Sequence, residues 1–169
     1  DLLTAARFEL GALSAHTTPT DLAAIAGRVI EALTSRVDLD IEAELRPAVA
    51  EVDAPRVRQI LRNLITNASR YGGDRIVVRT ARTNGTARIE VRDNGVGIGD
   101  ADPEAIFGAY QSAHEPGTQP GSVGLGLTIS RHLAQLMGGD LTFRRDEAWS
   151  VFALAFEDNP DSGSVEIEA

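Results

Sequence analysis

The sequence RQILRNLITNASRY, residues 58–71, combines an apolar helical face with a polar one. Apolar residues recur at helical spacing from Val57 to Ala68, as expected for a face packed on a core. Asn63 and Asn67 lie one turn apart on the adjoining face, so their side chains line up. Asparagine is a poor residue for the middle of a helix, so this pair indicates a function, although a plain solvated face is the alternative for this helix alone. An amide oxygen suits Mg²⁺ when phosphate oxygens and waters fill its other positions.

The motif Asp93-Asn94-Gly95-Val96-Gly97 follows about a helix length downstream, at the end of a strand-like run. Its glycines allow tight turns and close approach of a ligand to the backbone. An aspartate at the floor of a pocket can accept a hydrogen bond from the exocyclic amine of adenine, which distinguishes adenine from guanine. Taken alone, the motif is also a common turn sequence.

A third motif, GSVGLGL at residues 121–127, combines glycines with the expected start of a helix. Backbone N–H groups in such a loop form an anion site for phosphates. The spacing is neither that of a Walker P-loop nor that of a Rossmann turn. A flexible linker is the alternative for this motif alone, but the three motifs in this order favour one nucleotide site.

Composition limits the class of protein. The chain has 169 residues, enough for one domain, and an apolar fraction of 43%. It lacks cysteine, which excludes disulfides and thiolate metal sites. No apolar run approaches a membrane span, and we expect a cytoplasmic location. The net charge of −9 argues against non-specific nucleic-acid binding, and all sixteen basic residues are arginine.

The remaining pattern predicts alternating helices and strands. We expect helices over 1–15, 21–36, 53–71 and 123–137, with Asp21 and Asp53 as N-caps, and a break at 17–20. We expect strands over 40–45, 49–52, 75–82, 86–92, 141–145 and 150–156, with a hairpin turn at Asn84-Gly85. Residues 100–122 are expected to form a long loop with a short helix near 103–110. The fold class is therefore α+β, a layer of helices on a mixed, mostly antiparallel sheet.

Together the motifs resemble the catalytic, ATP-binding domain of sensor histidine kinases, within the Bergerat-fold superfamily. Residues 58–71 resemble its N box, and Asp93 to Gly97 its first glycine box. Residues 106–110 resemble its F box, and Gly121 to Leu127 its second glycine box. The resemblance covers roughly residues 20–156. It implies a two-layer sandwich with about three helices and a mobile ATP lid near residues 100–122.

The resemblance also implies roles for single residues. Asn67 would hold Mg²⁺, Asn63 would lie near the phosphates and Arg70 on a phosphate. Tyr71 would lie against the adenine, and Asp93 would accept its amine. The further residues expected around ATP are Gly95, Gly97, Ile98, Phe107, Gly121, Ser122, Val123, Gly124, Leu125, Gly126 and Leu127.

The identity of residue 63 bears on the reaction. Hydrolytic members of the superfamily carry a glutamate at this place, which activates water, whereas an asparagine has no basic pKa to offer. We therefore expect slow hydrolysis and transfer of the γ-phosphoryl group to a protein histidine. Two positions depart from the kinase pattern: Ser122 stands where a glycine is usual, and Gln111-Ser112 stand where the F box commonly ends in a basic residue. Arg70 and Arg131 are candidates to supply that cation.

We expect residues 1–19 to be the end of the second helix of an acceptor hairpin and its linker, residues 20–156 the catalytic domain, and residues 157–169 a disordered acidic tail. The acceptor histidine is expected outside this chain, because His16 lacks the acidic residue that follows the family's acceptor. Expected partners are the parent's dimerisation domain and a response regulator, and this piece alone should be monomeric. The sequence is compatible with a parent anchored in a membrane that keeps this domain on the cytoplasmic side. The alternatives are a degenerate nucleotide- or partner-binding module, and a serine kinase of the anti-sigma-factor type.

Overall fold

The computed structural model describes residues 13–36, 39–99, 102–108 and 125–158. Its helices are α2 (Leu22–Thr34), α3 (Ala54–Tyr71), α4 (Gly126–Leu136) and the short 3-10 helix η1 (Ala105–Phe107). Its strands are β1 (Thr18–Asp21), β2 (Ile41–Leu45), β3 (Val49–Val52), β4 (Ile76–Thr83), β5 (Thr86–Asp93), β6 (Asp140–Asp146) and β7 (Trp149–Glu157).

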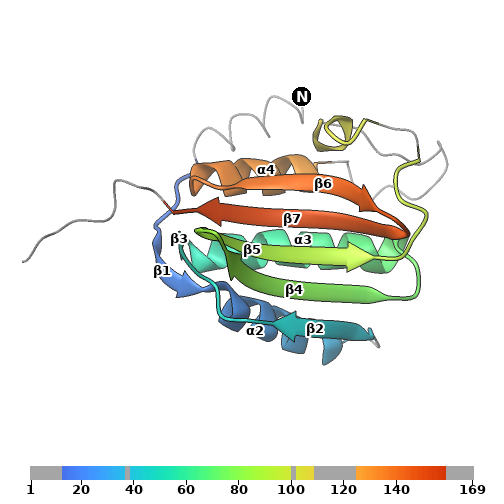
Figure 1. The fold of residues 1–169 in the computed structure, drawn as a ribbon, viewed down its shortest axis with the longest axis horizontal. Helices are drawn as coiled ribbons and strands as arrows, with labels where there is room; N and C mark the ends of the chain where they lie inside the picture. The colour runs from blue at the N-terminus through green and yellow to red at the C-terminus, as the bar shows by residue number, and fades with distance from the viewer. Residues whose placement is uncertain (1–12, 37–38, 100–101, 109–124, 159–169) are drawn as a thin grey trace, which may run out of the picture.

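A five-stranded sheet in the order β2-β4-β5-β7-β6 forms one layer, and α2, α3 and α4 cover one of its faces (Figure 1). Strand β2 runs parallel to β4, and the other neighbours are antiparallel. A separate antiparallel pair, β1 with β3, lies at the end of the sheet where β7 finishes. The predicted α+β sandwich with three helices on a mostly antiparallel sheet is confirmed.

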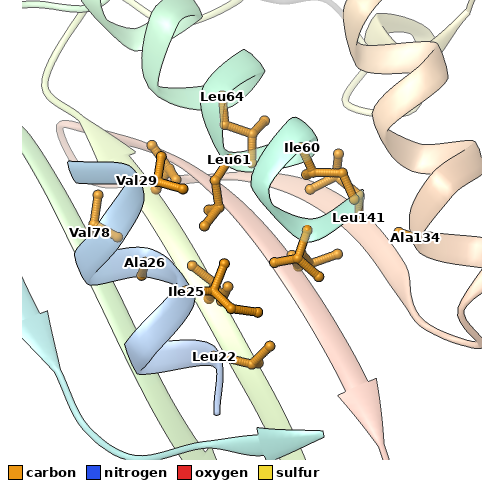
Figure 2. Close-up of a cluster of buried hydrophobic side chains, with 14 of the residues drawn as sticks. Leu22, Ile25, Ala26, Val29, Ile60, Leu61, Leu64, Val78, Ala134 and Leu141 are labelled. Atoms are coloured by element: carbon orange, nitrogen blue, oxygen red, sulfur yellow. The ribbon is translucent and has the colours of Figure 1, made fainter. Parts of the chain in front are cut away.

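The core lies between the helices and the covered face of the sheet. Figure 2 shows Leu22, Ile25 and Val29 of α2 turned toward Ile60, Leu61 and Leu64 of α3, with Leu141 of β6 beside them. All seven side chains are at most 4% exposed. Burying a Leu or Ile of this kind contributes about 1.5–3 kcal/mol, so the apolar stripe of α3 fixes which of its faces points away from the core.

Local signals in the sequence set the ends of several elements. The Asp21 carboxylate accepts the N–H of Ala23, and the Asp53 carboxylate accepts the N–H of Arg56, so both aspartates cap helices as predicted. Asn84 and Gly85 have φ values of 51° and 75°, which is the geometry of a two-residue hairpin turn. Both capped helices and the β4–β5 hairpin are therefore confirmed.

The start of the chain differs from the prediction. Leu13 to Thr17 form neither helix nor strand, and residues 1–12 of the expected first helix lie outside the described residues. The expected break at 17–20 contains strand β1, so the predicted domain boundary at residue 20 falls inside a strand. The N–H of His16 donates to the Asp53 carboxylate, 2.9 Å away, and β1 pairs with β3. Because these contacts use the backbone of residues 16–21, this segment is extended and not helical.

Two later boundaries also differ. Helix α4 begins at Gly126, inside the expected glycine loop, and residues 121–124 lie outside the described part of the chain. Strand β7 continues to Glu157, and Asp158 bonds the backbone of Gly85 and the side chain of Arg82. The expected acidic tail therefore begins with ordered residues, and residues 159–169 are outside the description. Within the described ranges, no helix has the length and apolarity to cross a bilayer.

Candidate functional site

Parts of three of the four sequence motifs lie on α3, after β5 and at the start of α4. The C-terminal end of α3 and the turn after β5 lie at the right of Figure 1, opposite the β1–β3 pair, and α4 begins beside Asn63 in the middle of α3. Asp93 pairs with Ser150 of β7, which in turn pairs with Arg145 of β6, so these three residues lie side by side across the sheet. Segments far apart in sequence thus supply one site.

Asn63 links α3 to α4. Its Nδ2 donates to Ser130 Oγ at 3.0 Å, and Ser130 is only 2% exposed. A Cβ at position 126 would lie 2.5 Å from Asn63 Oδ1, closer than atoms can pack. Glycine at this position permits the close approach of the first turn of α4 to the amide, and a larger residue would displace one or the other. The structure places Asn63, Gly126 and Ser130 together, and Ser130 had no sequence signal of its own.

Asn67 and Arg70 follow Asn63 on the same side of α3, and Tyr71 ends the helix. Asn67 is half-buried, and no hydrogen bond of its side chain falls within the described residues. Arg70 is exposed, and Tyr71 is 45% exposed despite its large apolar surface. The amide of Asn67 is therefore available to a ligand that approaches along this face.

Asp93 is a buried carboxylate, only 7% exposed. One of its oxygens accepts the N–H of Gly95 at 3.0 Å. Burial raises the pKa of Asp93 above its ordinary value, and the Gly95 N–H and the charge of Arg145 partly oppose that shift. A buried acceptor with a perturbed pKa at the edge of a site is typical of a group that contacts a ligand.

The neighbouring Asn94 has a structural role that the sequence did not reveal. Its Oδ1 accepts the N–H of Arg75 at 3.0 Å, and its Nδ2 donates to Asp74 at 2.7 Å. Both ends of the amide are thus used to join the turn after β5 to the beginning of β4. Ile98, farther along the turn, is half-buried against the core.

Phe107 anchors the segment that follows the turn. Its ring is 6% exposed and lies edge-on to Phe152 at 6.5 Å, and its carbonyl accepts from Thr128 Oγ at 2.8 Å. The Arg131 guanidinium lies 4.7 Å from the centre of the same ring. Phe107 therefore packs into the core in this structure, where it joins residues 102–108 to α4.

Arg131 is already committed to two carboxylates. Its Nη1 donates to Glu104 at 2.6 Å, and its Nε donates to Asp140 at 3.0 Å. These contacts hold Arg131 beside η1, so it does not replace the missing cation of the F box in this arrangement. An open pocket of about 330 Å³ lies here, between η1 and the outer side of α4, and it is lined by neither Asn67 nor Asp93.

Several residues singled out in the sequence lie outside the described part of the chain: Gly121, Ser122, Val123 and Gly124, together with Gln111 and Ser112. Leu125, Gly126 and Leu127 are described, and they form the N-cap and first turn of α4. Leu125 makes no side-chain cap hydrogen bond. The free N–H groups of a first turn, with the positive end of the helix dipole, favour an anion.

No group of three acidic or histidine side chains capable of holding a metal occurs among the described residues. A divalent cation at Asn67 would therefore take its other ligands from phosphate oxygens and water. Mg²⁺ is bound in this way in many nucleotide sites, through one or two protein oxygens, so the half-buried amide fits that ion.

Comparison with known proteins agrees with this geometry. Residues 52–165 match the family described as histidine kinase-, DNA gyrase B-, and HSP90-like ATPase. The signal transduction histidine-protein kinase AfsQ2 of Streptomyces coelicolor is 32% identical over 161 residues, which cover 95% of this chain and 30% of AfsQ2. The chain thus spans less than a third of that relative.

Solved structures show the same fold. The histidine kinase AdeS of Acinetobacter baumannii superimposes with a TM-score of 0.73 at 22% identity, covering 94% of this chain and 75% of AdeS. Full-length ShkA in complex with AMPPNP superimposes with a TM-score of 0.71 at 25% identity, covering 91% of this chain and 34% of ShkA. The chain therefore belongs to the family of histidine kinase-, DNA gyrase B- and HSP90-like ATPases, as an ATP-binding catalytic domain of the sensor histidine kinase type.

Proposed function

We propose that this domain transfers the γ-phosphoryl group of ATP to a histidine on the dimerisation domain of a longer sensor kinase. The observation that carries the proposal is Asn63, because this inward-facing position of α3 holds an amide and not a carboxylate. Its Nδ2 is bonded to Ser130 at 3.0 Å, and an amide cannot remove a proton from water. Hydrolysis is therefore slow, and the phosphoryl group is kept for an acceptor.

The nucleotide would lie between α3, the turn after β5 and the start of α4. Asp93 would accept the adenine amine, with Gly95, Gly97, Ile98 and Tyr71 around the base. Asn63, Arg70 and the first turn of α4 would face the phosphates. Asn67 would hold Mg²⁺, which neutralises charge on the phosphate oxygens when bound. Two observations support this placement: Asp93 is buried, and the half-buried side chain of Asn67 makes no hydrogen bond among the described residues.

The transfer itself needs little from the protein beyond position. An imidazole nitrogen of the acceptor attacks the γ-phosphorus in line, the bond to the β,γ-bridging oxygen breaks, and ADP leaves with that oxygen. The acceptor imidazole gives up a proton, and the residues around the phosphates hold the reacting atoms in line. In the parent protein a response regulator would then receive the phosphoryl group, and this domain would act in the cytoplasm.

The test is phosphoryl transfer from γ-labelled ATP to the dimerisation domain of the parent kinase, with Mg²⁺ present. We expect an acid-labile phosphorylated product, and we expect Asn67→Ala to lower the rate at least tenfold, since a ligand to the cation is lost. Gln59→Ala is the matched control, because Gln59 is an exposed amide on the same helix, and among the described residues its side chain bonds Arg56 alone.

Three results would contradict the proposal, each in a different way. An acid-stable product would indicate a serine kinase of the anti-sigma-factor type. Binding of ATP without transfer would indicate a nucleotide-binding module. An unchanged rate in a folded Asn67→Ala variant would remove Asn67 from the cation site.

A further inference from the structure

Arg145, the next to last residue of β6, reaches under the turn that follows β5. Its Nη1 donates to the carbonyl oxygen of Gly95 and to Ser150 Oγ, both at 2.9 Å. One guanidinium nitrogen thus joins the turn to the beginning of β7. No motif of the sequence marked either Arg145 or Ser150.

The same guanidinium occupies the space beneath Gly97. Gly97 has a φ of +71°, and a Cβ there would lie 2.8 Å from Arg145 Nη1. The positive φ favours glycine at this position, and the missing side chain also leaves the room that the Arg145 guanidinium takes. The Arg145 guanidinium thus lies in the space that a side chain at position 97 would fill.

Arg145 faces the site because of strand alternation. Leu141 and Phe143 point to the helix-covered face, and Arg145 follows at the same spacing of two. Arg144 points to the opposite face of the sheet, where it donates to Glu90 at 3.1 Å. Two adjacent arginines of one strand thus have different surroundings.

We propose that Arg145 is a positioning residue for the nucleotide base: it holds the Asp93–Gly97 turn in the conformation that directs the Asp93 carboxylate toward an adenine amine. The inference rests on the proposed ATP site and adds the residue that shapes its base-recognising part. Arginine suits this role, since its planar group bonds a carbonyl and a hydroxyl together while its charge faces a buried carboxylate. A lysine ammonium would keep the charge, but its tetrahedral nitrogen would not hold the two hydrogen bonds in the plane of the guanidinium.

The experiment compares Arg145→Met with Arg144→Met by calorimetric titration. Each variant is titrated with Mg-ATP and with the Mg complex of purine riboside triphosphate, which lacks the exocyclic amine. We expect Arg145→Met to weaken ATP binding about tenfold, the effect of a charged hydrogen bond lost, and the analogue about twofold. The preference of the protein for ATP over the analogue then falls about fivefold. Arg144→Met should leave both affinities within about twofold, because it changes the same charge on the other face.

The ratio of the two affinities separates positioning from mere stability. An unfolded or loosened domain would lose both ligands equally, whereas a displaced turn loses the amine contact. Equal losses for ATP and the analogue, or an unchanged ATP affinity, would overturn the inference. If Arg145→Met does not fold, Arg145→Lys takes its place, with an intermediate loss of preference expected. Failure of the unsubstituted domain to bind ATP would contradict the proposed function instead.

Discussion

At the scale of single residues, Asp93 shows a conflict between stability and binding. Its carboxylate is 7% exposed, and burial raises its pKa above the ordinary value of 3.8. For an acid whose pKa is higher in the folded than in the unfolded state, the stabilising contribution is complete below the unfolded pKa. That contribution is lost as the pH rises through the folded pKa. At neutral pH the buried, ionised Asp93 therefore destabilises the folded state. A ligand that donates a hydrogen bond to this carboxylate offsets that loss.

We predict that Asp93→Asn at pH 7 binds ATP at least tenfold more weakly while its melting temperature stays the same or rises. The amide removes the buried charge but presents no anionic acceptor to the adenine amine. Calorimetry and thermal denaturation of the same preparation measure both effects. Asp40→Asn is the control, because Asp40 is an exposed aspartate outside the site and should change neither quantity. A lower melting temperature with unchanged affinity would contradict the assignment.

At the scale of elements, two helical glycines contrast in their surroundings. Gly126 opens α4, and a Cβ there would lie 2.5 Å from Asn63 Oδ1. Gly27 lies inside α2, and a Cβ there would lie 3.6 Å from Leu45 Cδ1, which is an ordinary contact. Alanine is the better helix former, so the effect of each substitution is decided by what the added methyl group meets.

We predict that Gly27→Ala raises the free energy of unfolding by up to about 1 kcal/mol and leaves ATP affinity unchanged. Gly126→Ala should displace Asn63 or the first turn of α4, and so weaken ATP binding severalfold. Urea denaturation and calorimetry on both variants check this pair of outcomes. A Gly126→Ala variant that binds ATP normally would show that the Asn63–Gly126 approach is not needed by the nucleotide.

At the scale of the whole molecule, a ligand at the proposed site would contact α3, the turn after β5 and the start of α4. These segments are far apart in the chain and come together only in the folded domain. Mg-ATP should therefore stabilise the entire fold cooperatively: at a hundred times its dissociation constant, by about 2.7 kcal/mol. A melting temperature that rises with ATP in the unsubstituted domain, and much less in Asp93→Asn, would bear this out, whereas equal shifts in both would contradict it.

Whether an element depends on near or distant parts of the chain explains which elements can be predicted from the sequence. The caps at Asp21 and Asp53, the apolar stripe of α3 and the Asn84-Gly85 hairpin depend on neighbours in the chain, and they were predicted correctly. Strand β1 was missed because β3, with which it pairs, lies about thirty residues away and leaves no local pattern.

The residues of the candidate site fall into the same two groups, those in local motifs and those placed by distant contacts. Asn63, Asn67 and Asp93 belong to motifs that can be found along the chain, and their roles toward a nucleotide stay predictions. Arg145 and Ser150 reach that end only through the register of β5, β7 and β6, and Ser130 only through the packing of α4 on α3. Such residues carry no sequence signal until the sheet order is known.

The hairpin turn at Asn84-Gly85 lies at the opposite end of β5 from Asp93, eight strand residues or about 27 Å away. The chain contains neither cysteine nor lysine. A single thiol introduced at the exposed Thr83 would therefore be the sole target for maleimide coupling, and side-chain amines would not compete. Attached to a biosensor chip through that thiol, every molecule would present its nucleotide end to the flowing solution in the same orientation.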